Sequence, residues 1–212
     1  MSHRFRRSAA LLVLLLAAAT PAMAEKSVPV GKALPYLEAY LKLPAAERTR
    51  FAPAYYFRIG AQPMAVPVWL VQGGVRTAMP LNAQGRMERL PTLAQLADGK
   101  LTFGVDPAVK FGVRLQIEPT MAPAADLDAH ELAAAIAQAA TGERKAAGVL
   151  ARVAPKLKEV GFVGVASGEV EFSDGRKAAL PLVDGVPTYS PTALPNARRI
   201  RLPKVPDRLE LG

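Results

Sequence analysis

The sequence contains no cysteine, and its 212 residues include only two histidines. The absence of thiols excludes disulfide bonds, cysteine nucleophiles and thiolate metal ligands. His3 belongs to an N-terminal segment with the character of a signal peptide, so His130 is the one histidine of the remaining chain. If catalysis used a nucleophile activated by a histidine base, His130 would have to be that base. The fold has to be held together by buried apolar area.

Long apolar runs are also scarce, and the clearest one is short. Ala9–Ala19 is apolar throughout, follows three arginines between positions 4 and 7, and precedes the small residues Ala22 and Ala24. A helix that crosses a membrane needs about 20 apolar residues, whereas a secretory signal has this composition and length. We therefore predict a signal peptide over residues 1–24, cleavage after Ala24, and a periplasmic or secreted protein.

Aromatic residues make up 6% of the chain, and 27 Lys and Arg outnumber 18 Asp and Glu, a net charge of +9 at pH 7. Cleavage of the predicted signal removes three arginines, which leaves 24 against 18, or +6. Nucleic-acid-binding proteins usually carry a clustered basic stripe with aromatic side chains for stacking. These charges are spread, so we expect no nucleic-acid partner and no membrane span after cleavage. The expected partner is an anionic envelope component or another envelope protein.

Motifs for nucleotides and cofactors are missing. The stretches "GAQPMAVPVW" (60–69) and "VGVASGEV" (163–170) contain glycine but lack the spacing of phosphate-binding loops. No Ser-x-x-Lys spacing occurs either. The sequence therefore predicts no cofactor.

The segment "DLDAHEL" places His130 among carboxylates, a pattern with two interpretations. One is a metal or acid–base cluster, but its members do not share a helix face and further ligands are missing. The other is a helix start, with Asp128 as the N-cap and Glu131 completing a capping box. We predict the helix start, no metal site and no catalytic residue here.

A stretch of the chain is repeated about a hundred residues later. "GVRTAMPL" (74–81) and "GRKAALPL" (175–182) share four of eight residues, and Gly85 then aligns with Gly185. The shared Gly, Pro and Leu are residues that a hairpin turn and its exit require. We predict tight turns at Gln72-Gly73-Gly74, Ser173-Asp174-Gly175 and Val183-Asp184-Gly185, because such turns need residues that tolerate positive φ. The repetition therefore indicates a repeated scaffold.

The flanks of the two copies also correspond. Each copy follows two helical patterns and precedes strand patterns. The predicted helices are 34–43 and 44–51, then 128–140 and 142–154; the predicted strands are 55–60, 100–105 and 112–119, then 160–168, 198–203 and 207–212. We predict an α+β fold of two tandem related units, 25–120 and 126–212, each a helical pair followed by an antiparallel β-meander, with residues 119–125 as the linker.

Carboxylates near the predicted strands leave room for an envelope hydrolase that uses a carboxylate pair. The candidates are Glu118, Glu169, Glu171 and Asp174. The spacing of Glu169 and Glu171 is equally typical of the solvent-facing side of a strand.

Weak binding candidates are Trp69 and the basic stretch near the C-terminus, with Arg198, Arg199 and Arg201. The arginines have two interpretations. They form a site for an anion or a partner, or they protect an edge strand from pairing with another copy of the chain.

The sequence favours a non-catalytic binding or scaffold protein of the cell envelope over an enzyme. Two observations support this preference: the chain has few residues of the types used in catalysis, and the repeated segment consists of turn and core residues. A ligand would then lie in the cleft between the two units. The alternatives are the hydrolase and an assembly or inhibitor protein that acts through an edge strand or the basic stretch.

Overall fold

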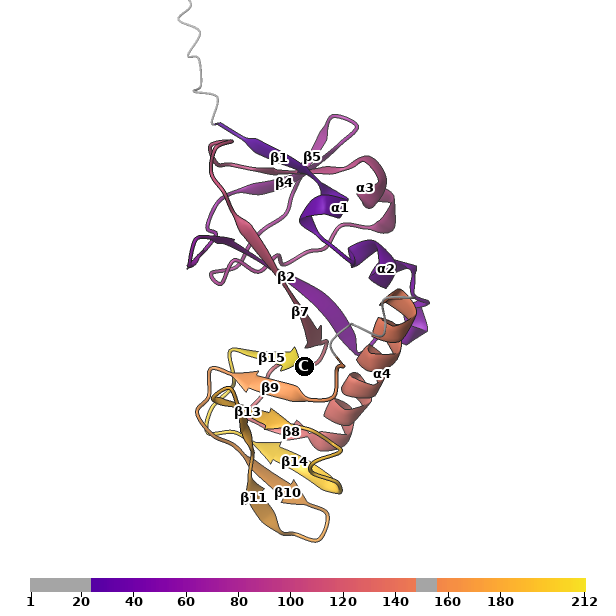
Figure 1. The fold of residues 1–212 in the computed structure, drawn as a ribbon, viewed down its shortest axis with the longest axis vertical. Coiled ribbons are helices and arrows are strands. Elements are labelled where there is room, and N and C mark those ends of the chain that lie inside the picture. Colours follow the sequence, from indigo (N-terminus) through magenta and orange to yellow (C-terminus); the bar gives the residue numbers. More distant parts are fainter. Residues whose placement is uncertain (1–23, 148–155) are drawn as a thin grey trace, which may run out of the picture.

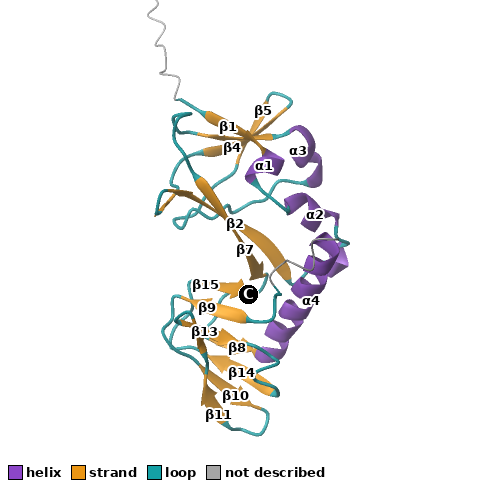
Figure 2. Ribbon diagram, viewed as in Figure 1, coloured by secondary structure: helices purple, strands orange, loops and turns teal. Residues whose placement is uncertain are grey.

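A computed structural model describes residues 24–147 and 156–212. The predicted signal peptide lies outside them, apart from Ala24. The described residues form helices and antiparallel sheets, so the predicted α+β class is confirmed (Figures 1 and 2). The elements are β1 (Lys26–Pro29), α1 (Val30–Ala33), α2 (Leu37–Lys42), the 3-10 turn η1 (Ala45–Glu47), β2 (Phe51–Ile59), β3 (Gln62–Pro63), β4 (Val68–Gln72), β5 (Val75–Ala78), α3 (Leu93–Asp98), β6 (Lys100–Phe103), β7 (Gly112–Pro119), β8 (Asp126–Asp128), α4 (Ala129–Ala147), β9 (Val160–Val163), β10 (Glu169–Phe172), β11 (Lys177–Ala179), β12 (Leu182–Val183), β13 (Val186–Tyr189), β14 (Ala197–Arg201) and β15 (Arg208–Leu211).

The strands of the described residues form three sheets. Two sheets have four strands each, in the orders β1-β6-β4-β5 and β8-β14-β10-β11. The third has seven strands in the order β12-β13-β9-β15-β7-β2-β3. The last strand of the first half, β7, pairs antiparallel with the last strand of the second half, β15. One continuous sheet therefore runs through both halves of the chain.

Each four-stranded sheet packs on one part of the seven-stranded sheet and encloses its own core. The first core includes Tyr55, Phe57, Leu70, Leu101 and Phe103, with helix residues Val30, Leu34 and Leu37. The second core includes Leu132, Phe162, Val170, Ile200 and Leu209. Fully buried positions alternate with partly buried ones along strands such as β10 and β15, which produces these one-sided apolar faces.

The long β2–β7 ribbon belongs to both cores. Phe51 at the start of β2 packs in the second core, whereas Tyr55 packs in the first. On β7, Leu115 contacts the first core and Ile117 contacts the second. Figure 1 shows this twisted ribbon in the middle of the elongated molecule, between the two four-stranded sheets. The two cores are therefore joined by shared strands as well as by the linker.

Helix α4 runs along the same junction and contacts α2, β2 and β7 as well as β8 and β14 (Figure 2). The prediction of a new helix at residue 142 is wrong, because α4 continues through Gly142 to Ala147. A Cβ on Gly142 would lie 2.5 Å from the ring of Phe51, so the glycine permits close approach of α4 to β2. The remainder of the predicted segment, 148–154, lies outside the described residues. Within the described ranges, no helix has the length and apolar character needed to cross a membrane.

The predicted helices of the first half are shorter than expected. Pro35 separates α1 from α2 because the residue before a proline is disfavoured in helical geometry, and Tyr36 then takes a left-handed φ of 63°. The predicted helix 44–51 is reduced to the turn Ala45–Glu47, and Phe51 already begins β2. The apolar side chain of Phe51 is buried, which favours the strand here.

The strand predictions at 55–60, 100–105, 112–119, 198–203 and 207–212 are confirmed within a few residues, while 160–168 forms a strand only to Val163. The predicted tight turns also form. Gly73 and Gly74 link β4 to β5, and Asp184 and Gly185 link β12 to β13, all with positive φ. The interpretation of the basic stretch as an edge strand is wrong, because β14 lies between β10 and β8.

Candidate functional site

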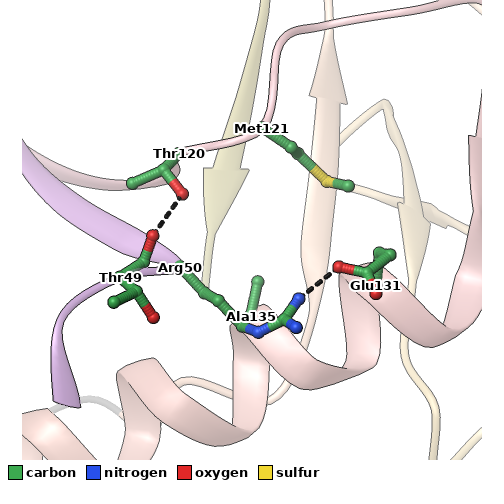
Figure 3. A pocket seen from close by; sticks show the side chains of 6 residues that line it. All are labelled: Thr49, Arg50, Thr120, Met121, Glu131 and Ala135. Carbon is green, nitrogen blue, oxygen red and sulfur yellow. Dashed lines mark hydrogen bonds and ion pairs between the residues drawn. The ribbon is translucent and has the colours of Figure 1, made fainter. Parts of the chain in front are cut away.

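A pocket of about 330 Å³ opens where the first and second halves of the chain meet. Its walls come from the segment before β2, the segment after β7, and the first two turns of α4. Figure 3 shows the lining side chains, which are Thr49, Arg50, Thr120, Met121, Glu131 and Ala135. The volume is at the lower end of the range typical of small-molecule sites.

Two of the lining residues, Arg50 and Glu131, form an ion pair. The guanidinium Nη1 of Arg50 donates to Oε2 of Glu131, and Figure 3 shows the two side chains pointing towards each other. The side chains remain 43% and 53% exposed, respectively. Exposed ion pairs contribute little to stability, so both groups can exchange partners at low cost.

The backbone around Arg50 is held by α4 and by the end of β7. Gln138 of α4 accepts a hydrogen bond from the Arg50 amide at 2.7 Å and donates to the Ala46 carbonyl at 3.1 Å. The Thr120 hydroxyl donates to the Thr49 carbonyl at 2.8 Å. The backbone that carries Arg50 is therefore held by contacts between distant parts of the chain.

The helix start predicted at Asp128 is confirmed. Its carboxylate accepts hydrogen bonds from the amides of His130 at 2.8 Å and Glu131 at 3.2 Å. The predicted completion of a capping box by Glu131 is wrong, because the Glu131 side chain pairs with Arg50 instead of accepting from the Asp128 amide. Within residues 24–147 and 156–212, no group of three or more His, Asp or Glu side chains could hold a metal ion.

A second polar cluster lies on the outer face of the seven-stranded sheet, opposite the cores. The Tyr56 hydroxyl donates to Glu118, whose side chain is only 10% exposed. Arg86 donates to the same carboxylate from Nε at 3.1 Å and from Nη2 at 2.9 Å. The guanidinium of Arg208 lies 5.6 Å from the centre of the Tyr56 ring. Burial, and then the hydrogen bond to Glu118, raise the pKa of Tyr56.

Glu118 and Glu210 lie on the paired strands β7 and β15, on the same face. Glu210 pairs with Arg208 at 2.5 Å and accepts a hydrogen bond from Gln116 at 3.1 Å. Each carboxylate thus has an arginine partner, whereas a carboxylate-pair hydrolase must leave one carboxyl group protonated and open to substrate. The geometry favours a structural role for this cluster at the junction of the two halves.

The buried tyrosines predict a loss of stability at alkaline pH. Burial raises the pKa of Tyr55 and of Tyr56, while an unfolded tyrosine ionises near pH 10. Their stabilising contribution is therefore complete below about pH 10 and is lost as the pH rises towards the folded-state pKa values. Urea unfolding followed by circular dichroism between about pH 8 and 11 should show this decline. Tyr56→Phe should flatten the decline, whereas Tyr36→Phe, at a position that is 69% exposed, should leave its slope unchanged.

The remaining carboxylate candidates point to solvent and are paired. Glu169 contacts Lys177 at 3.0 Å and Glu171 contacts Arg201 at 2.9 Å, while Val170 between them is buried. Asp174 contacts Arg176 at 2.7 Å. These contacts match the predicted solvent-facing pattern.

The weak binding candidates do not come together at the pocket. Arg199 pairs with Asp126 at 2.8 Å and holds the pKa of that carboxyl below its usual value. Arg201 pairs across to β10, and Arg198 is exposed. Trp69 lies in β4, half-buried beneath Arg76, whose guanidinium is 4.3 Å from the ring centre.

Sequence reasoning missed Arg50, because it fell inside a predicted helix whose polar residues carry no motif. Glu131 was singled out, but for capping. The available signal was weak: an arginine directly before an apolar strand. Comparison of the chain with known protein families, with curated proteins and with solved structures found no match.

Proposed function

We propose that this chain is an exported, non-catalytic binding protein of the cell envelope, with its ligand site in the pocket at Arg50 and Glu131. The observation that carries the proposal is the origin of the lining: the pocket takes Arg50 from the first half and Glu131 from the second. A cleft between two units of a protein is a common place for a ligand. The ion pair there is exposed and exchangeable.

The proposal includes two related units produced by internal duplication. In support, the two four-stranded sheets have corresponding orders, β1-β6-β4-β5 and β8-β14-β10-β11. In each, the strand that precedes the helices pairs with the penultimate strand of that half, and the penultimate strand also pairs with the first strand of a hairpin. The repeated glycines also agree in conformation: Gly85 and Gly185 have φ of 75° and 79°. The antiparallel contact of β7 with β15 relates the two last strands by a local two-fold axis.

Native mass spectrometry of the mature protein, purified gently from the periplasm of its own host, tests the proposal. We expect a mass that begins at Glu25 and a small-molecule adduct. The adduct should be lost in Thr120→Trp, which fills the pocket, and retained in Thr141→Trp. The two threonines are matched, because both are exposed and both donate to a backbone carbonyl, but Thr141 lies outside the pocket.

Two outcomes would overturn the proposal. One is that neither the parent protein nor any of the variants carries an adduct. The other is an adduct that survives Thr120→Trp unchanged, because the ligand would then lie elsewhere on the chain.

A further inference from the structure

We propose that the ligand of this pocket is a free α-amino acid with an apolar side chain, or a zwitterion of the same size. This inference rests on the proposed binding function and adds the chemical class of the ligand. It is carried by three features of the lining: two opposite charges side by side, spare hydrogen-bonding capacity on both, and an apolar side chain, Met121, among the lining residues.

The charges come first. Arg50 and Glu131 meet through a single contact from Nη1 to Oε2. A guanidinium has five N–H donors and a carboxylate about four acceptor positions, so most of the capacity of both groups is unspent. Within the described residues, no other side-chain hydrogen bond of either group is found. A ligand can therefore bind both groups without breaking a network.

The arrangement selects for a ligand that carries both charges. A carboxylate can take the planar donors of Arg50 in a two-bond contact, and an ammonium can bind Glu131. A simple anion would approach the negative charge of Glu131 and leave that group without a cation, and a simple cation would do the same to Arg50. An α-amino acid replaces the ion pair with two new ones and leaves the total charge unchanged.

The other lining residues limit the size of the ligand and the kind of side chain that it can carry. Met121 packs against the second core and is only partly buried, so it offers apolar surface to the pocket, while Ala135 lines the pocket but is 2% exposed. The Thr120 hydroxyl donates a hydrogen bond to the Thr49 carbonyl. The Thr49 hydroxyl oxygen lies 3.1 Å from the side-chain nitrogen Nε2 of Gln138. With polar side chains already engaged and a volume of about 330 Å³, the pocket suits a small apolar side chain.

Isothermal titration calorimetry with L-leucine tests the inference on mature protein that has been dialysed free of small molecules. We expect saturable binding of L-leucine and at least tenfold weaker binding of N-acetyl-leucine, which lacks the ammonium, and of leucine amide, which lacks the carboxylate. Glycine should also bind more weakly than leucine, because it cannot use the apolar surface.

Variants separate the two charges from general effects on α4. Arg50→Gln and Glu131→Gln should each weaken leucine binding at least tenfold. The control is Lys145→Gln, which breaks another ion pair between α4 and the segment before β2, at 2.6 Å from Glu47, outside the pocket. Lys145→Gln should bind leucine as the parent does. Circular dichroism melting of all three verifies folding.

Equal binding of leucine and N-acetyl-leucine would overturn the inference in favour of a simple anion site. Absence of binding by any amino acid would also overturn it. In that case the proposed function still stands if the adduct of the native protein disappears in Thr120→Trp, so the two failures are distinguishable.

Discussion

Replacement of Gly85 by alanine is expected to lower the free energy of unfolding by about 2–5 kcal/mol. Gly85 has a φ of 75°, where an L-residue costs about 1–2 kcal/mol. In addition, a Cβ there would lie 2.4 Å from the carbonyl oxygen of Phe57 and 3.1 Å from the amide nitrogen of Met64. These are backbone atoms of β2 and its neighbour, which cannot rotate away. Overpacking of this kind adds about 1–3 kcal/mol.

Gly185 is the matched control, because it aligns with Gly85 in the repeated stretch and has a φ of 79°. No heavy atom lies within 4 Å of a Cβ built on Gly185. Gly185→Ala should therefore lose only the conformational contribution of about 1–2 kcal/mol. Urea denaturation of both variants measures the difference. If both variants lost the same free energy of unfolding, the close approach of Gly85 to β2 would not contribute to the cost of Gly85→Ala.

Replacement of Leu211 by alanine is expected to lower the free energy of unfolding by about 2–5 kcal/mol. Leu211 is 5% exposed in the second core, on β15, which pairs with β9 on one side and with β7 on the other. The truncation leaves a cavity where the two halves of the chain share a sheet. Leu182→Ala is the control, because Leu182 is 58% exposed and should change stability by about 0.5 kcal/mol or less.

The same variant tests whether the two halves unfold together. Trp69, the one tryptophan of the chain, lies in β4 and reports on the first four-stranded sheet. Because the seven-stranded sheet and the β2–β7 ribbon connect the cores, we expect Leu211→Ala to shift the tryptophan fluorescence transition as much as the circular dichroism transition. A fluorescence transition that stays in place would show that the first half unfolds independently.

Local features of the fold could be predicted from the sequence because they depend on neighbouring residues. The hairpin at Gly73 and Gly74 needs only residues that tolerate positive φ, and the start of α4 needs only a capping carboxylate at Asp128. The strand over 112–119 was predicted at its observed limits. The same local rules predicted a helix break at Gly142, where α4 in fact continues. The glycine is needed there because Phe51 from a distant strand packs against it.

The candidate site was less predictable than the fold. Asp128 and Glu131 were recognised as a helix start, yet the sequence contains no sign that Glu131 would meet Arg50, which lies 81 positions earlier. The buried Glu118 was considered only as one carboxylate among several. Its partners Tyr56 and Arg86 come from other segments of the chain.

The secondary structure class, the tight turns and the alternating strand faces could be predicted from the sequence alone. Those properties follow from residue type and from spacings of a few residues. The sequence contained no sign that β7 pairs with β15, that the ribbon β2–β7 serves two cores, or that Arg50 and Glu131 share a pocket. The physical reason is that strand partners and side-chain neighbours far apart in sequence are selected by register and packing of the whole chain, which local patterns do not specify.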